Sequence, residues 1–483
     1  MNSGAFFNFG GDTNNRTHAG NISGAGKVAK WGTSAVTLTG TNTFSGGINH
    51  NSGTLIAGAA NLGTGPVQMT GNGSVSTLSL TGNIANDIHF ANGSTANKVI
   101  NLATGVTDAE LSGTITLAAD STTDGKSRIS PAAGGTIVVS GKMTGAGTGG
   151  YAKRNPGTVV ITGTTNDYTG PTHVVDAGTL LVDGNVPGSV LFGQNLDGSS
   201  TAGRNGTLGG SGTIGGNLTA QSVSNIAPGG TSAAGVTTPT AAVLSIVGNL
   251  DVSALAGGSG LLWMDLDAPA GTNDRLAVGG TATIGTLALD DFAFNNLGGL
   301  AAGSYTLISS AGIVGAVDGT PGTIAPGFDG VLSISGNDVV LTVSASGGAY
   351  DTWVSSFGLA GPEAAFDFDK DLDGFDNGLE WILGGNPTIA DAASIAASGV
   401  TLEFTREEDS IGVADLVVEY GTTLAAWPGS ATVGASTTPP DGNGVSVTIN
   451  DVPDPDEVTV NIPAINAGGT GKLFARLKAV LLP

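Results

Sequence analysis

The stretch Val36-Thr-Leu-Thr-Gly-Thr-Asn-Thr-Phe-Ser-Gly46, with Gly53-Thr-Leu-Ile-Ala-Gly58 after it, decides the fold. It recurs as Val159-Val-Ile-Thr-Gly-Thr-Thr-Asn-Asp-Tyr-Thr-Gly170, with Gly178-Thr-Leu-Leu-Val-Asp-Gly184 after it. Both copies hold short β-branched runs bounded by Gly, Asn and Ser, which is the pattern of strands and turns. The second copy is longer by one residue in each of two turns, and stacked-strand architectures tolerate insertions there.

Similar runs, such as Thr77–Leu80 and Thr136–Val139, continue over the first 345 residues, and no helix of ordinary length is expected between them. A second rhythm at Gly206–Leu218 repeats Gly about every three residues with an aliphatic residue between. We therefore predict an all-β fold in which residues 1–346 form a right-handed parallel β-helix. Each coil of about twenty residues would contribute two or three strands and bury its aliphatic side chains.

Composition supports this prediction and excludes several classes of protein. Glycine accounts for 82 of 483 residues, and only 11% of residues are charged, so helices are disfavoured. Hydrophobic residues reach 40%, which argues against disorder. The absence of cysteine excludes disulfides, thiolate metal sites and thiol catalysis. The net charge of −23 argues against nucleic acid and anionic membranes as partners, and no apolar run is long enough for a transmembrane segment.

A change in charge marks a domain boundary near residue 347. From Tyr350 onward the chain carries 20 acidic and 5 basic residues, against 19 and 11 before it. We predict a linker with a calcium loop and a short helix over 347–394, and a small β-sandwich over 395–483. The strands expected in the sandwich are 400–404, 416–420, 445–449, 458–462 and 473–477, because apolar and polar residues alternate there.

The linker contains the sharpest chemical signal of the chain, Asp369-Lys-Asp-Leu-Asp-Gly-Phe-Asp-Asn-Gly-Leu-Glu380. Calcium prefers six to eight oxygen ligands, and this spacing supplies them within one loop. The glycine at the sixth position permits a sharp turn. The predicted metal ligands are Asp369, Asp371, Asp373, the carbonyl of Phe375, Asn377 directly or through water, and Glu380 with both oxygens.

The eighth position of such a loop is normally apolar because it pairs with a second loop, but here it is Asp376. No second copy of the motif exists in the sequence, so we expect a solitary Ca²⁺ loop. The alternative interpretation is a solvated acidic linker, which is the usual meaning of a charge run. A helix over 378–384 should follow and end at Gly384-Gly385.

No catalytic set is found in the sequence, and we predict that the protein is not an enzyme. The four histidines are widely separated, and His50 and His173 are expected in turns or on the surface. Asp265 and Asp267 could serve a glycosidase, but alternate residues of one strand more often form a solvated face. A polysaccharide-active β-helix enzyme and a carbohydrate-binding tail built around Trp427 and Tyr420 remain as alternatives.

The two related stretches resemble the autotransporter-associated β-strand repeat. The resemblance lies in Gly40-Thr-Asn-Thr-Phe-Ser-Gly46 with Gly53-Thr-Leu55, and in Gly163–Gly170 with Gly178-Thr-Leu180. The tail is similar to a C-terminal region of large exported proteins from Verrucomicrobia-like bacteria. The tail carries this resemblance at Trp353, the Asp369–Glu380 loop, Gly385-Asn-Pro387, Trp427 and Phe474–Lys478.

These resemblances imply a bacterial protein that is secreted or displayed at the cell surface, with a structural or adhesin-like role. Met1-Asn-Ser-Gly lacks the pattern of a signal peptide, so the chain is either cytoplasmic or a fragment or has a misplaced start. The calcium chemistry and the repeats favour the second interpretation. The partners expected are extracellular polysaccharides or cell-surface components.

Overall fold

The short strands of the first 345 residues pair in long parallel sheets, as the alternating pattern predicts. The computed structural model describes residues 1–11, 13–71, 73–92, 96–119, 127–193, 206–230, 240–325, 328–345, 348–390, 395–398, 401–450 and 455–481. Contacts divide the chain into two compact units, Met1–Ala345 (unit 1) and Ser346–Pro483 (unit 2).

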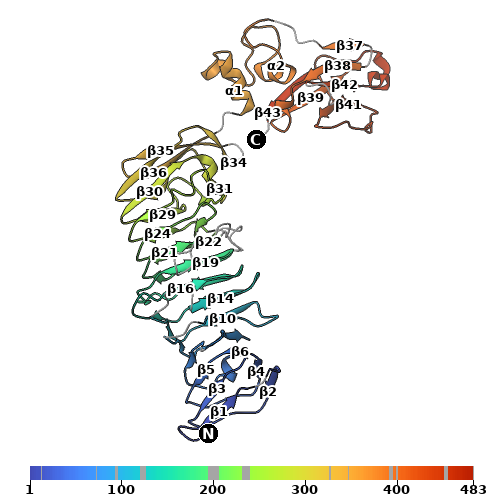
Figure 1. Ribbon diagram of the computed structural model, residues 1–483. Coiled ribbons are helices and arrows are strands. Elements are labelled where there is room, and N and C mark those ends of the chain that lie inside the picture. The colour runs from blue at the N-terminus through green and yellow to red at the C-terminus, as the bar shows by residue number, and fades with distance from the viewer. Residues whose placement is uncertain are drawn as a thin grey trace. The chain divides into compact units, whose positions relative to one another are not determined.

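Unit 1 is a stack of coils whose strands form four sheets (Figure 1). Sheet A contains β1 (Phe6–Phe9), β3 (Lys27–Lys30), β5 (Ile48–His50), β7 (Val67–Met69), β9 (Ile88–Phe90), β12 (Ile115–Thr116) and β15 (Met143–Thr144). Sheet B contains β2 (Arg16–His18), β4 (Ala35–Leu38), β6 (Gly53–Ala57), β8 (Ser76–Leu80), β10 (Lys98–Leu102), β13 (Ser127–Ile129), β16 (Tyr151–Lys153), β18 (Thr172–Val174), β21 (Val190–Phe192), β24 (Leu218–Thr219), β27 (Leu250–Asp251), β30 (Thr281–Leu287) and β33 (Gly312–Val317).

The other two sheets of unit 1 begin later in the chain. Sheet C contains β11 (Asp108–Leu111), β14 (Thr136–Val139), β17 (Thr158–Ile161), β19 (Gly178–Val182), β22 (Gly206–Gly210), β25 (Asn225–Pro228), β28 (Leu262–Leu266) and β31 (Phe292–Asn296). Sheet D contains β20 (Asn185–Val186), β23 (Thr213–Ile214), β26 (Val243–Ile246), β29 (Arg275–Val278), β32 (Gly303–Ser309), β36 (Asp338–Ala345), β35 (Phe328–Ser335) and β34 (Gly322–Ala325).

The order of the strands confirms a parallel β-helix with two or three strands in each coil. The first coils alternate between sheets A and B, and the later coils pass through sheets B, C and D. The parallel stack ends where β36 pairs antiparallel with β32 and β35, and β34 pairs antiparallel with β35. The C-terminal end of the β-helix is therefore covered by antiparallel strands from the stretch that follows Leu261.

Aliphatic ladders inside the coils hold the stack together. In sheet C each inward-facing residue pairs with its equivalent in the next coil, and these residues are at most 6% exposed. The ladder runs through Ala109, Ile137, Val159, Leu180, Leu208, Ile226, Leu262 and Phe292. Because each rung touches the next, the stack buries one continuous apolar core, which is the main source of its stability.

Buried asparagines satisfy the backbone where the coils turn. The Oδ1 atom of Asn42 accepts from Ile22 N at 2.7 Å, and its Nδ2 donates to Asn61 O at 2.5 Å. Asn166, at the equivalent position of the second copy, accepts from Met143 N at 2.6 Å and donates to Asn185 O at 2.7 Å. Each asparagine thus connects the preceding and the following coil, since turn groups without partners would be costly.

Two lysines also lie inside the stack at equivalent positions of the two copies. The Nζ atom of Lys30 donates to the carbonyls of Gly32 and Ser52, both at 3.0 Å. That of Lys153 donates to the carbonyls of Asn155 at 2.6 Å and Ala177 at 3.1 Å. Burial lowers the pKa of Lys153 to about 7, while the charge of nearby Asp176 raises it.

Lys153 should make the stability of unit 1 depend on pH. Its pKa is lower in the folded state than in the unfolded state, so the unfolded chain binds more protons between about pH 7 and pH 10.5. Stability contributed by this group should therefore rise with pH over that window, by up to about 1.4 kcal/mol per pH unit. The free energy of unfolding of Lys153→Met, measured by chemical denaturation at several pH values, should lack this rise. Lys142→Met, which removes a half-exposed lysine paired with Asp167, should keep it.

The prediction that His50 and His173 lie in turns or at the surface is wrong. Both are buried, in β5 and β18, and the Nε2 atom of His50 lies 3.0 Å from Gly53 O. Burial is the main cause that lowers the pKa of His50 to about 4. The inward position of His50 follows from strand alternation, since it lies on the same face of β5 as the core residue Ile48. His173 alternates with the core residue Val174 and is buried on the other face of β18.

Unit 2 contains two short α-helices and two antiparallel sheets. The helices are α1 (Ala349–Ser356) and α2 (Asn377–Leu383), with 3-10 turns η4 (Gly361–Ala364) and η5 (Glu408–Ser410). One sheet has the order β37 (Ala396–Ser398), β38 (Thr401–Arg406), β42 (Asp456–Asn461) and β41 (Ser446–Asn450). The other has the order β40 (Gly429–Val433), β39 (Ala414–Gly421) and β43 (Phe474–Leu481).

Residues from the predicted linker and from the predicted sandwich share one core in unit 2. Tyr350, Ile382 and Trp381 from the linker pack in the same hydrophobic cluster as Phe404 and Val418 from the sheets. Within the residues that the structure describes, no helix has the length and apolar character needed to span a membrane.

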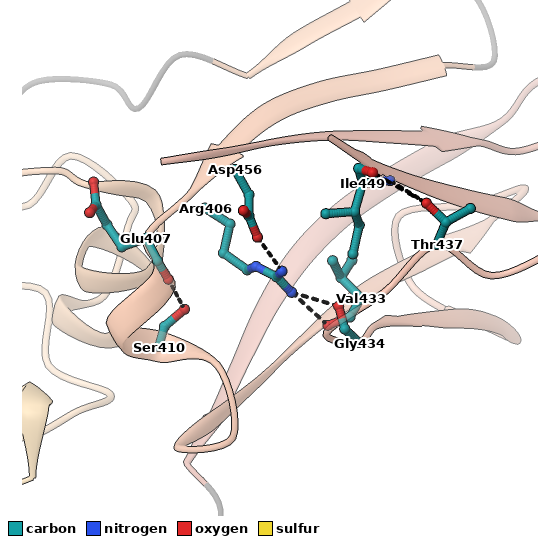
Figure 2. Close-up of polar contacts among 8 residues, drawn as sticks. All are labelled: Arg406, Glu407, Ser410, Val433, Gly434, Thr437, Ile449 and Asp456. Atoms are coloured by element: carbon teal, nitrogen blue, oxygen red, sulfur yellow. Dashed lines mark hydrogen bonds and ion pairs between the residues drawn. The ribbon is translucent and has the colours of Figure 1, made fainter. Parts of the chain in front are cut away.

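The buried side chain of Arg406 joins the two sheets of unit 2. The Nη2 atom of Arg406 in β38 lies 2.5 Å from Asp456 Oδ2 in β42, and both side chains are at most 4% exposed. The Nη1 atom donates to Gly434 O at 2.7 Å, just beyond the end of β40 in the other sheet (Figure 2). The guanidinium group thus satisfies groups from both sheets at once.

Candidate metal centre

The predicted calcium loop lies between η4 and α2 and is folded around its first aspartate. Asp369 Oδ1 accepts from Leu372 N at 2.7 Å, and Asp369 Oδ2 accepts from Gly374 N at 3.0 Å. Leu372 and Gly374 adopt positive φ angles of 65° and 101°. The turn predicted at Gly374 is present, and it curls the loop so that its acidic side chains converge.

The structure brings the three predicted aspartate ligands together. Carboxylate oxygens of Asp369, Asp371 and Asp373 lie within 4.8 Å of one another, and all three residues are half-buried. Asp371 Oδ1 accepts from Asp373 N at 3.2 Å, and Asp373 Oδ1 accepts from Phe375 N at 2.8 Å. The Oδ2 atom of Asp373 is buried and has no hydrogen-bond partner among the described residues. The cluster therefore offers oxygen lone pairs that backbone donors do not use.

The other predicted ligands are placed differently. Asn377 is the first residue of α2, and its Nδ2 donates to the carbonyls of Glu363 and Ala365, each at 2.9 Å. Its Oδ1 is buried without a hydrogen-bond partner in the described part of the chain. Glu380 lies one turn further along α2, is buried, and is outside the aspartate cluster. Phe375 directly follows the turn, and its ring packs against the core of unit 2.

Asp376, at the eighth position of the loop, is the N-cap of α2. Its Oδ1 accepts from Leu379 N at 2.8 Å, which satisfies a donor of the first helical turn. Burial raises the pKa of Asp376, and the charges of Asp367 and Asp369 raise it further. A helix that begins immediately after the loop therefore explains why this position is acidic. Sequence reasoning missed this role, although an Asp before an apolar helical run is a capping signal.

The donor set suits a hard divalent cation. Carboxylate, amide and carbonyl oxygens are the ligands that Ca²⁺ prefers, and three carboxylates held this close repel one another unless a cation is bound. Lys370, inside the loop, pairs with Glu363 at 2.6 Å. The three aspartates fit the oxygen donors that such a cation prefers, and a bound ion would supply positive charge to the loop.

The acid pair considered for a glycosidase does not form a solvated face, and that interpretation is wrong for Asp265. Asp265 is fully buried, and its Oδ1 accepts from Asn295 Nδ2 at 2.9 Å. Asp274 is also fully buried, and it accepts from Ala242 N at 2.7 Å and Asp265 N at 2.9 Å. Burial is the main cause that raises the pKa of Asp274 to about 8. These carboxylates bridge neighbouring segments of the stack.

Trp427 and Tyr420 do not form an open sugar platform. The Arg476 guanidinium carbon lies 4.8 Å from the centre of the Trp427 ring, so a cation already covers one face of that ring. Tyr420 is 4% exposed and belongs to the core of unit 2. The placement of these two residues gives no support to the carbohydrate-binding alternative.

Comparison with known families identifies the repeats. A family model described as passenger-associated-transport-repeat matches residues 28–57 and 152–182. A comparison with curated protein sequences finds no match. Each matched segment covers two consecutive coils whose strands pair with each other, β3 with β5 and β4 with β6 in the first, β16 with β18 and β17 with β19 in the second. The two stretches that suggested the resemblance are thus similar to an autotransporter passenger repeat, and both lie within the parallel β-helix of unit 1.

Proposed function

We propose that the protein is an extracellular or cell-surface, non-catalytic β-helix with a structural or adhesive role, and that calcium stabilises unit 2. The observation that supports the β-helical role is that each segment matching the passenger repeat contains two consecutive coils whose strands pair with each other. Such a segment is a complete unit of the stack, so the repeat accounts for the architecture and needs no active site.

The outer surface of the stack supports contacts with an extended partner. Thr136, Thr158, Thr179 and Thr207 pair with one another in four successive coils of sheet C. Thr136, Thr158 and Thr207 are half-buried, whereas Thr179 is 4% exposed. Strands of one sheet lie about 4.8 Å apart, so three coils of this ladder offer hydroxyl groups in line with the stack. Repeated weak contacts of this kind gain strength through multivalency, which suits a polysaccharide or a component of a cell surface.

Two measurements test the proposed location and role. Antibodies against the chain should label intact cells that produce it, and external protease should remove the label. Incubation with acidic and neutral polysaccharides should show binding without new reducing ends or unsaturated products. Release of either product would contradict the non-catalytic role, and labelling only after permeabilisation would contradict the location.

The calcium site of the proposal comprises Asp369, Asp371 and Asp373, with Phe375 O, Glu380 and Asn377 completing the set. The support is the convergence of three carboxylates, together with the buried oxygens Asp373 Oδ2 and Asn377 Oδ1. Ca²⁺ binding to the folded state alone would stabilise unit 2 by about 2.7 kcal/mol at a free concentration of 100 times Kd.

Asp371→Ala should abolish calcium-dependent stabilisation. We expect the parent protein to bind one Ca²⁺ by calorimetry and to melt at higher temperature in millimolar calcium than in chelator. The variant should melt at the chelator temperature in both conditions because it lacks a ligand. Asp367→Ala removes an exposed carboxylate just outside the loop and should retain the calcium response. Equal melting temperatures of parent and Asp371→Ala in saturating calcium would contradict the site.

A further inference from the structure

An open pocket of about 470 Å³ lies in unit 2 beside the C-terminal end of α2. The residues that line it include Trp353, Trp381, Gly384, Glu407 and Asp409. The volume is within the range of about 300–1,000 Å³ that small-molecule sites occupy. The calcium loop precedes α2, so the pocket and the proposed metal centre lie at opposite ends of this helix.

Neighbouring rings hold the aromatic wall of the pocket in place. The ring of Trp353 lies 5.0 Å from that of Phe357 and 6.0 Å from that of Tyr350, measured between centroids. Trp381 is held by Tyr350 at 5.6 Å and by Phe366 at 6.5 Å. A ligand entering the pocket would therefore meet aromatic surface that is already ordered, which lowers the entropic cost of binding.

The acidic wall is equally well anchored. Glu407 N donates to Ile382 O in α2 at 2.9 Å, and Glu407 O accepts from Ser410 Oγ at 2.6 Å (Figure 2). A Cβ atom placed on Gly384 would lie 2.6 Å from Glu407 Oε1, so the carboxylate rests directly against this glycine. Asp409 lies two residues further on, in η5, and is exposed at the mouth.

The two charged side chains of the pocket favour a cation, against the partial positive charge of the N-terminal end of α1, where Ala349 also lines the pocket. It combines two carboxylates with the C-terminal end of α2, whose carbonyl groups carry partial negative charge. None of the described residues that line it is basic. The faces of tryptophan rings attract cations, and carboxylates accept hydrogen bonds from ammonium groups. An anion or a neutral apolar ligand would leave these carboxylates poorly solvated.

We propose that this pocket binds the primary ammonium group of a linear alkylamine, either a free diamine or the side chain of a lysine. The ammonium would donate hydrogen bonds to Glu407 and Asp409, and the alkyl chain would lie along Trp353. A primary ammonium suits the pocket better than a quaternary one, since a quaternary ammonium cannot donate to carboxylates. The inference goes beyond the proposed function and does not depend on calcium or on display at the cell surface.

Calorimetric titration of the full chain in 150 mM NaCl tests the proposal. The probes are cadaverine, Nα-acetyl-lysine amide, tetramethylammonium and the neutral 1,5-pentanediol. Saturable binding of one cadaverine or one lysine amide per chain is expected, at least tenfold tighter than binding of the diol. Tighter binding of cadaverine would identify a free amine as the ligand, and equal or tighter binding of the lysine amide would identify a protein side chain.

Matched variants separate the pocket from the general negative charge of the chain. Glu407→Gln should weaken binding of the ammonium at least tenfold, and Asp409→Asn, at the exposed mouth, should weaken it at least threefold. Glu408→Gln removes the same charge from an exposed neighbour that does not line the pocket, so it should change Kd less than twofold. Equal effects of Asp409→Asn and Glu408→Gln, tighter binding of tetramethylammonium, or no saturable binding of either amine would overturn the proposal.

Discussion

Arg406→Met is expected to lower the free energy of unfolding of unit 2 by about 3–5 kcal/mol, because it leaves Asp456 buried without its cation. The Asp456 carboxylate is 1% exposed, so water cannot replace the guanidinium group. The carbonyl of Gly434 loses its donor as well. Denaturant titration measures the loss when it is followed by tryptophan fluorescence, to which the buried Trp381 of unit 2 contributes.

Two further variants show whether the cost comes from the unpaired charge. Arg406→Met combined with Asp456→Leu removes both members of the pair and should recover most of the lost stability. Arg476→Met breaks the more exposed pair with Glu419 and should cost about 1 kcal/mol or less, since solvent screens that pair. A loss from Arg406→Met no larger than that from Arg476→Met would show that the buried pair has little role in stability.

Gly170→Val is expected to destabilise unit 1 by at least about 3 kcal/mol, because the coils are too close at this corner for a side chain. A Cβ atom on Gly170 would lie 1.8 Å from Gly149 O in the preceding coil. The contact is with backbone, so no rotamer change can relieve it, and the two coils would have to separate. Hydrogen exchange of β16 and β18 measures the opening.

Gly312→Ala provides the control for this effect. Gly312 is the first residue of β33 in sheet B, and a Cβ atom there would meet only the Oγ1 atom of Thr281, at 3.8 Å. The added methyl group should therefore change stability by no more than about 0.5 kcal/mol. Equal protection of β16 and β18 in the parent and in Gly170→Val would refute the close-packing argument.

Strand positions were predictable from the sequence because the stack repeats one simple pattern. The runs at Val36, Thr158 and Gly178 became β4, β17 and β19, since alternation and flanking turn residues specify a strand within a few positions. Helix α1 was not predicted. Its sequence Ala349–Ser356 contains Thr, Trp, Val and Ser, which are mediocre helix formers, so packing in the core of unit 2 decides its conformation.

The buried polar residues were not predictable from single positions. Lys153, Asn166 and Asp265 are polar residue types that are usually exposed, and their burial depends on carbonyls and amides contributed by other coils. The sequence did contain a sign that Lys153 and Asn166 are buried, because Lys30 and Asn42 occupy the equivalent positions in the first copy of the repeat. Comparing the two copies residue by residue would have marked these side chains as structural.

The arrangement of the acidic loop was predictable in part. The spacing of Asp369, Asp371 and Asp373 implied that the carboxylates converge, and the structure places them together. The position of Glu380 depends on where α2 begins and how it packs, and spacing alone does not contain that information. Ligation by Glu380 and Asn377 stays a prediction, which the calcium titration addresses.

The short sequence interval between paired strands has a mechanical consequence. Val36 pairs with Leu55, Leu55 with Leu78 and Leu78 with Ile100, so each of these N-terminal coils is followed by its neighbour after only about 20 residues of chain, whereas later coils such as the one from Leu218 to Leu250 are longer. A pulling force on the ends of unit 1 would peel one coil before the next is loaded. Each step in the N-terminal coils would release about 70 Å of extended chain, and the longer coils would release more. The remaining coils would stay folded, so unit 1 would extend in steps under force instead of unfolding all at once.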